Sequence, residues 1–178
     1  FPKLYEYYKI KKFTWDRTGG DPITQGNRNP ILYKDMGGDG LKTGHLEDSG
    51  YSLAATIKKD ERRILSVISG LSSKNARSKE TVRLLSYAKN RFDLLKINKK
   101  DESFKIKTWN LKPKKVQLSL ANDLYLTIPK RQKSKIKIEI EHEDQILKTV
   151  VKESQPVSKL NIFFEDKLIK SEILYSTV

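Results

Sequence analysis

Hydrophobic and polar residues alternate along several short stretches in the first half of the chain, which predicts β-strands. Residues 51–57 place every second side chain, all apolar or aromatic, on one face. A charged turn at 58–61 separates them from a second apolar stretch at 63–69, so we expect an antiparallel hairpin. Before it, residues 3–10 are consistent with the end of a helix and 13–15 with a brief strand.

After the hairpin, the apolar period changes from two residues to three or four. Ser72 and Ser73 offer N-cap hydroxyls, and a helix is predicted over residues 74–92. Its apolar side is formed by Thr81, Leu84, Leu85, Ala88 and Phe92. Two paired strands followed by a long helix that packs on them are typical of an α+β domain.

The second half of the chain predicts strands without a convincing helix. Roughly seven short stretches in about 80 residues alternate or are apolar: 104–108, 116–120, 124–128, 135–141, 146–151, 160–164 and 168–174. This pattern is typical of a small all-β, sandwich-like domain. Because residues 96–103 are polar and charged, we interpret them as a linker and predict two domains, 1–93 and 94–178.

The chain is strongly basic, with a formal net charge of +14 over 178 residues. Residues 1–93 and 94–178 each contain 18 basic and 11 acidic residues, so each part carries 18 − 11 = +7. A nucleic-acid site usually concentrates positive charge on one face, so no nucleic-acid partner is predicted. We interpret the lysines as solvating surface residues that would also favour contact with an anionic lipid or polymer.

Several kinds of chemistry are excluded or unsupported by the sequence. There is no cysteine for a disulfide or a thiolate, and no apolar run long enough to cross a bilayer. No metal or cofactor is predicted, and His142, between acidic neighbours, is expected to be structural or solvated. The first residues carry neither an initiator Met nor a signal-peptide pattern, so we expect the chain to be part of a longer protein.

The most informative stretch is Asp39-Gly40-Leu41-Lys42-Thr43-Gly44-His45. A Lys-Thr-Gly triplet leading into a strand is a motif of penicillin-recognising serine enzymes. Gln25-Gly26-Asn27-Arg28-Asn29-Pro30 precedes it, Ser49-Gly50-Tyr51 follows it, and Leu126-Thr127-Ile128-Pro129-Lys130 stands in the second half. With these neighbours the chain resembles the low-molecular-mass D-alanyl-D-alanine carboxypeptidases, a penicillin-binding protein family. The resemblance implies part of a penicillin-binding, β-lactamase-like transpeptidase domain, with an antiparallel sheet and a packed helix, before a β-rich domain.

The resemblance also implies roles for five residues. Lys42 would place an ammonium group in the cleft, and the backbone N–H of His45 would form half of the oxyanion hole. The Thr43 hydroxyl would bind the terminal carboxylate of a D-Ala-D-Ala peptide, near Arg28. Gly44 would leave room for the substrate backbone to approach this strand.

Each role has a structural alternative. Lys42 would otherwise be an exposed strand lysine, and the His45 side chain an ordinary loop histidine. Arg28 would otherwise serve as a cap or pair with Asp35 or Asp39. These alternatives stay open at the level of sequence.

The family's nucleophile motifs, Ser-x-x-Lys and Ser-x-Asn, precede Lys-Thr-Gly, whereas the matching patterns in this chain follow Lys42. They stand at 86–89, 134–137 and 73–75, and we interpret them as chance. This chain alone is therefore predicted to be inactive. As an incomplete catalytic core, its first domain is expected to expose apolar residues that the rest of the catalytic domain would cover: Leu53, Ile57, Val67 and Leu85.

The resemblance implies a serine-type carboxypeptidase that removes the terminal D-alanine from peptidoglycan stem peptides through an acyl-enzyme. β-Lactams would bind in place of the substrate, and no cofactor is implied. The whole protein would be periplasmic and peripheral to the inner membrane. The alternative is a non-catalytic module that docks its basic β domain to cell-wall polymer, a membrane surface or a protein partner.

Overall fold

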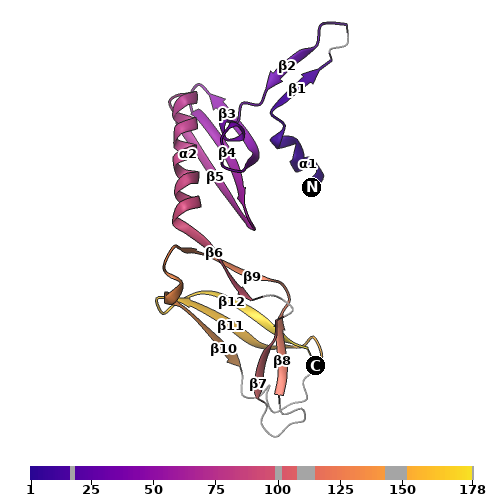
Figure 1. The fold of residues 1–178 in the computed structure, drawn as a ribbon, viewed down its shortest axis with the longest axis vertical. Helices are drawn as coiled ribbons and strands as arrows, with labels where there is room; N and C mark the ends of the chain where they lie inside the picture. Colours follow the sequence, from indigo (N-terminus) through magenta and orange to yellow (C-terminus); the bar gives the residue numbers. More distant parts are fainter. Residues whose placement is uncertain (17–18, 99–101, 108–114, 143–151, 178) are drawn as a thin grey trace. The chain divides into compact units, whose positions relative to one another are not determined.

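The computed structural model describes residues 1–16, 19–98, 102–107, 115–142 and 152–177. The chain folds into two compact units, Phe1–Arg91 and Phe92–Val178 (Figure 1). The boundary predicted from the sequence, after residue 93, lies two residues beyond this division.

The first unit is organised around a three-stranded antiparallel sheet with strand order β3-β4-β5. Its elements are β3 (Gly38–Leu46), β4 (Gly50–Lys59), β5 (Arg62–Leu71) and helix α2 (Lys74–Arg91). Helix α2 begins after Ser73, whose hydroxyl accepts a hydrogen bond from the Ala76 N–H at 3.0 Å. The predicted hairpin and the helix that follows it are confirmed.

Helix α2 lies along one face of this sheet and closes a small core (Figure 1). The core residues are Ile31, Leu53, Ala55, Ile57, Ile64 and Leu85. The expectation that Leu53, Ile57 and Leu85 would be exposed is wrong, because Leu85 of α2 packs in one buried core with Leu53 and Ile57 of β4. Val67 points to the opposite face and is 69% exposed, as expected for an incomplete catalytic core.

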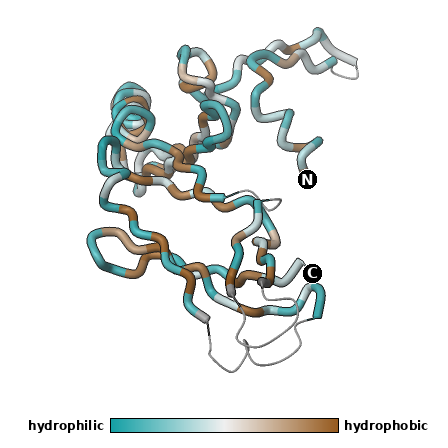
Figure 2. The backbone as a smooth tube through the Cα atoms, turned by 60° about the horizontal axis from the view of Figure 1, so that its bottom comes forward, coloured by the Kyte–Doolittle hydropathy of each residue, from teal (hydrophilic) through white to brown (hydrophobic). Residues whose placement is uncertain are grey.

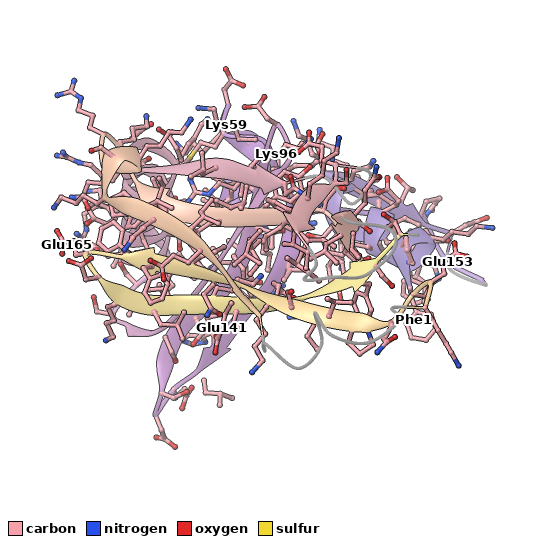
Figure 3. The ribbon with its side chains drawn as sticks, turned by 90° about the horizontal axis from the view of Figure 1, so that it is seen from below. Phe1, Lys59, Lys96, Glu141, Glu153 and Glu165 are labelled. Atoms are coloured by element: carbon pink, nitrogen blue, oxygen red, sulfur yellow. The ribbon has the colours of Figure 1, made fainter. Side chains whose placement is uncertain are left out.

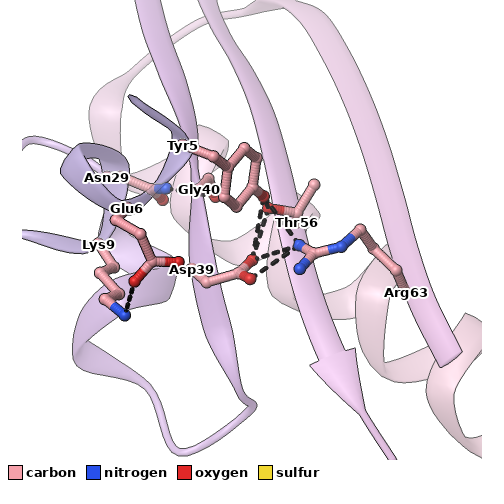
Figure 4. A network of polar contacts seen from close by, with 8 residues as sticks. All are labelled: Tyr5, Glu6, Lys9, Asn29, Asp39, Gly40, Thr56 and Arg63. Carbon is pink, nitrogen blue, oxygen red and sulfur yellow. Dashed lines mark hydrogen bonds and ion pairs between the residues drawn. The ribbon is translucent and has the colours of Figure 1, made fainter. Parts of the chain in front are cut away.

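Short elements precede the sheet: helix α1 (Pro2–Tyr5), the 3-10 helices η1 (Glu6–Lys9) and η2 (Pro30–Tyr33), and the hairpin of β1 (Lys12–Trp15) and β2 (Ile23–Gly26). Asn29 joins these elements to the sheet. Its buried side chain accepts a hydrogen bond from the Ile31 N–H at 3.0 Å. The same side chain donates a hydrogen bond to the Gly40 carbonyl at 2.7 Å (Figure 4). The start of β3 is thereby fixed to the segment that carries Arg28.

A second polar network holds α1 against all three strands (Figure 4). The Asp39 carboxylate accepts hydrogen bonds from the Tyr5 hydroxyl at 3.2 Å, the Thr56 hydroxyl at 2.8 Å and the Arg63 guanidinium at 2.8 Å. The hydrogen bond and charge of Asp39 raise the pKa of Arg63 above its ordinary value. The network therefore joins α1, β3, β4 and β5 just before the Lys-Thr-Gly triplet.

We expect Asp39→Ala to lower the free energy of unfolding of the complete protein by about 1–3 kcal/mol, because the buried Thr56 hydroxyl and its partners lose their acceptor. Glu6→Ala is the matched control, since Glu6 pairs only with exposed Lys9 in the described residues. Glu6→Ala should lower the free energy of unfolding by about 0.2–0.5 kcal/mol, the usual scale for such a helical pair. Denaturant unfolding measures both, and equal losses would contradict this account of the network.

The described residues of the second unit form two antiparallel sheets. One has five strands in the order β10-β11-β12-β8-β7, and the other pairs β6 with β9. The strands are β6 (Phe92–Asn98), β7 (Phe104–Lys107), β8 (Lys115–Leu120), β9 (Leu124–Pro129), β10 (Ile136–His142), β11 (Pro156–Phe164) and β12 (Lys167–Ser176). The predicted strand at 146–151 and the His142 side chain lie outside the described part of the chain.

The predicted linker at 96–103 is wrong at its start, since residues 96–98 belong to β6. Lys96 pairs with Tyr125 and Asn98 with Leu124, both on β9. The apolar residues of β6 stand among charged ones and pair with a strand about 30 residues away, so the local pattern gave little indication of it.

The two sheets of the second unit share one hydrophobic core. Its buried residues are Ile106, Val116, Leu118, Leu120, Leu124, Val157, Leu160, Ile162 and Leu174. Leu124 and the partly buried Leu126 come from β9 and pack with side chains of the five-stranded sheet. Figure 2 shows hydrophobic and hydrophilic positions alternating along these strands. The predicted all-β, sandwich-like fold is confirmed, as is the α+β character of the first unit.

Charged side chains form the outer layer of both units. Lys59, Lys96, Glu141, Glu153 and Glu165, which are labelled in Figure 3, are all exposed. No helix in the described ranges is long and apolar enough to cross a membrane.

Candidate functional site

A groove of about 950 Å³ runs along β3 in the first unit. Its lining contains every site residue predicted from the sequence: Arg28, Lys42, Thr43, Gly44 and His45. Other lining residues come from η1, β2, β4 and the first turn of α2, and they include Tyr7, Tyr8, Gln25, Tyr51, Lys74 and Arg77. The structure thus brings together segments that are distant in the sequence.

The Lys-Thr-Gly strand is an edge strand. Among the described strands, β3 pairs only with β4, with Lys42 opposite Ala54 and Gly44 opposite Ser52. Its consecutive residues 41–45 all line the groove. The free backbone edge of β3 is therefore available to an extended ligand that adds to the sheet.

The groove is cationic. Arg28, Lys42, Lys74 and Arg77 line it, and no Asp or Glu is among its described lining residues. The exposed Lys42 ammonium donates a hydrogen bond to the Thr43 carbonyl at 2.6 Å and has no ion-pair partner in the described part of the chain. Such a lining attracts an anionic group.

Gly44 is not required by packing within this chain. A Cβ atom built on it would meet only the Ser52 Cβ, at 3.6 Å, which is ordinary van der Waals contact. At Gly38, on the same strand, a Cβ atom would lie 2.6 Å from the Ile31 carbonyl oxygen, so that glycine is structural. Because position 44 has no side chain, it leaves space in the groove beside β3.

Arg28 is exposed at the groove and forms no ion pair with any residue that the structure describes. Its alternative role as a partner of Asp39 is wrong, because the Asp39 carboxylate is engaged by Arg63 at 2.8 Å. Asp35 forms no described ion pair with Arg28 either. The guanidinium of Arg28 is thus free to meet a ligand.

Arg77 lines the same groove and was missed by the sequence reasoning. Arg77 is 6% exposed, and its Nη1 donates a long hydrogen bond of 3.4 Å to the Gly44 carbonyl. Its Nε is buried and has no hydrogen-bond partner among the described residues. Arg77 and Gly44 are 33 residues apart, so their contact left no local signal.

The His45 side chain packs on Tyr51 of β4, directly across the strand pair. Their ring centroids lie 3.9 Å apart at an interplanar angle of 33°. The imidazole therefore acts as a packing group at the end of β3.

The serines of the three Ser-x-x-Lys and Ser-x-Asn matches are not among the residues that line the groove, although Lys74 of one match is. Ser86 lies inside α2, and Ser134 lies in the 3-10 helix η3 (Lys133–Lys135) of the second unit. Ser73 caps α2. None of these serines is placed to act as a nucleophile in the groove.

Two family models match the chain. The model for D-alanyl-D-alanine carboxypeptidase covers residues 1–73, and that for the C-terminal domain of penicillin-binding protein 5 covers residues 92–178. Together they include the Lys-Thr-Gly strand and the whole β-rich unit.

Individual proteins agree with the family models. The D-alanyl-D-alanine carboxypeptidase DacD of Salmonella typhimurium is 31% identical over 172 residues, which cover 94% of this chain and 42% of that protein. DacA of Escherichia coli is 29% identical over 177 residues, 97% of this chain and 42% of the relative. The chain also resembles the crystal structure of penicillin-binding protein 5 from Haemophilus influenzae, with 28% identity and a TM-score of 0.81. This match covers 98% of the present chain and 50% of the chain in that crystal structure. The chain therefore spans about two fifths of the length of the curated relatives it matches.

Proposed function

Because the chain belongs to the low-molecular-mass D-alanyl-D-alanine carboxypeptidases and corresponds to their C-terminal portion, we propose that its groove holds the D-Ala-D-Ala end of peptidoglycan stem peptides. The complete protein would remove the terminal D-alanine through a serine acyl-enzyme, and β-lactams would occupy the same groove. The observation that carries this proposal is the cationic groove along the Lys-Thr-Gly strand, whose described lining contains no carboxylate.

The substrate would lie along the free edge of β3. Its backbone would add to the strand beside Gly44, where no side chain blocks the approach. Its terminal carboxylate would meet the Thr43 hydroxyl and the guanidinium groups of Arg28 and Arg77. Carboxylates bind such forks of N–H donors with both strength and directional specificity.

The chemistry would develop negative charge on the carbonyl oxygen of the scissile bond. The backbone N–H of His45 would donate to that oxyanion, and the nearby Lys42 ammonium would stabilise the same build-up of charge. The nucleophilic serine would come from the part of the protein that precedes this chain, as in the family pattern of motifs. We propose in addition that the complete protein acts in the periplasm and contacts the inner membrane peripherally.

A fluorescent penicillin added to the complete protein tests the proposal directly. We expect one covalently labelled protein band, reduced by prior addition of a peptide ending in D-Ala-D-Ala. Denatured protein is the control for non-specific acylation. A complete, folded protein that takes up no label would favour the alternative of a non-catalytic docking module.

Thr43→Ala should weaken transition-state stabilisation for a peptide with a free terminal carboxylate by about 1.5–3 kcal/mol, the scale of a hydrogen bond to a charged group. The matched peptide amide should lose less, because it presents no full charge to the hydroxyl. Thr43→Ser keeps the hydroxyl and is the control variant. Acylation rates for the acid and amide peptides measure the difference, and equal losses for both would remove Thr43 from the carboxylate site.

A further inference from the structure

Tyr51 touches two groups of the groove that belong to different elements. Its ring lies 3.9 Å from the His45 ring of β3, measured between centroids. The Cζ atom of Arg77, on α2, lies 5.6 Å from the centroid of the same Tyr51 ring, within the range of a cation–π contact. Tyr51 itself lies near the start of β4, so one ring connects β3 and β4 with the helix.

Arg77 has few other contacts that fix its guanidinium. Its described hydrogen bond to the Gly44 carbonyl is long, at 3.4 Å, and its Nε has no described partner. The face of the Tyr51 ring attracts the Arg77 guanidinium, and such a contact leaves N–H donors of the guanidinium available to a ligand. The orientation of Arg77 in this groove therefore depends on Tyr51.

His45 in turn holds Tyr51. The two residues are directly opposite in the β3–β4 ladder, where stacked aromatic pairs stabilise a fixed ring position. The hydroxyl of Tyr51 has no hydrogen-bond partner in the described part of the chain, so the ring rather than the hydroxyl carries these contacts.

We propose that Tyr51, held by His45, is a positioning residue that orients the Arg77 guanidinium toward the ligand carboxylate. This inference rests on the proposed function and adds a determinant of specificity: Tyr51 sets how strongly the groove prefers an acid over an amide. Tyr51 does not touch the reacting bond and acts through Arg77.

Two substitutions in the complete protein separate the ring from the hydroxyl. Tyr51→Leu should lower the acylation rate for the peptide acid about tenfold, in line with the loss of a desolvated cation–π contact, and change the rate for the peptide amide less than about twofold. Tyr51→Phe keeps the ring and should stay within about twofold of the parent for both peptides. Thermal unfolding of each variant is recorded beside the rates.

A double-mutant cycle with Arg77→Lys tests whether Tyr51 acts through Arg77. Lysine keeps the charge and loses the planar fork, so Tyr51→Leu should have little further effect in that background. Equal losses for acid and amide, or additive losses in the cycle, would overturn the proposal and leave Tyr51 as a packing residue.

A binding measurement distinguishes failure of this inference from failure of the proposed function. N-acetyl-D-alanine and its amide are compared for their shift of the melting temperature of the complete protein, without any chemistry. In the parent protein the acid should raise the melting temperature more than the amide does, and Tyr51→Leu should abolish this difference. That result supports the positioning role, even for a protein that takes up no penicillin. No preference for the acid in the parent protein would overturn it.

Discussion

Lys42→Ala in the complete protein is expected to slow acylation by a penicillin or a D-Ala-D-Ala peptide by roughly 10²–10³, equivalent to about 3–4 kcal/mol. The reason is that the Lys42 ammonium lies on the free edge of β3 inside the groove, with no described carboxylate to neutralise it. Its positive charge is thus available to the oxyanion and to the anionic substrate. The measurement is the second-order acylation rate.

The same substitution should leave the melting temperature nearly unchanged, because the Lys42 side chain is exposed and bonds only a neighbouring backbone carbonyl. Lys59→Ala is the matched control, since Lys59 is an exposed lysine at the end of β4 outside the groove lining. It should acylate at the parent rate. If Lys42→Ala also acylates at the parent rate, the Lys-Thr-Gly triplet is an ordinary strand segment without a role in acylation.

Local sequence patterns were sufficient for the elements whose partners are close in the chain. The β4–β5 hairpin and α2 are formed by neighbouring residues, and their apolar periods change where the secondary structure changes. The residues of the triplet were found together because they are consecutive on one strand. Arg28 belongs to a motif that is also local, and its role stays a prediction. The hydrogen bond from the neighbouring Asn29 side chain to the Gly40 carbonyl, which fixes this segment to β3, could not be read from the sequence.

Features that depend on distant contacts were not predictable in the same way. Strand β6 is defined by its pairing with β9, and its charged residues made it resemble a linker. Leu53, Ile57 and Leu85 were expected to need a missing partner, whereas Leu85 of α2 and the two β4 residues bury one another in one core. Arg77 reaches the groove only because α2 packs its first turn beside β3, and a lone arginine in a basic helix has no distinguishing pattern.

Arg77 also gives the second large effect. Arg77→Ala should weaken binding and acylation of a peptide with a free terminal carboxylate by about 2–5 kcal/mol, the scale for truncating one partner of a buried charge pair. Arg77 is 6% exposed, so its interaction with a carboxylate would be little screened by solvent. The peptide amide should lose much less, and the acid-to-amide ratio of acylation rates is the measurement.

Arg28→Ala is the internal control for this prediction, because Arg28 lines the same groove but is exposed. An exposed ion pair contributes about 0–1 kcal/mol, so its loss should be several-fold at most. Arg77→Lys distinguishes charge from geometry: it keeps the positive charge but loses the planar guanidinium, so it should retain only part of the acid preference. Because Arg77 packs against Tyr51, the melting temperature of each variant is compared with the parent. If Arg28→Ala abolishes the acid preference while Arg77→Lys and Arg77→Ala retain it, the carboxylate site lies at Arg28, and the buried guanidinium serves only to hold α2 against β3.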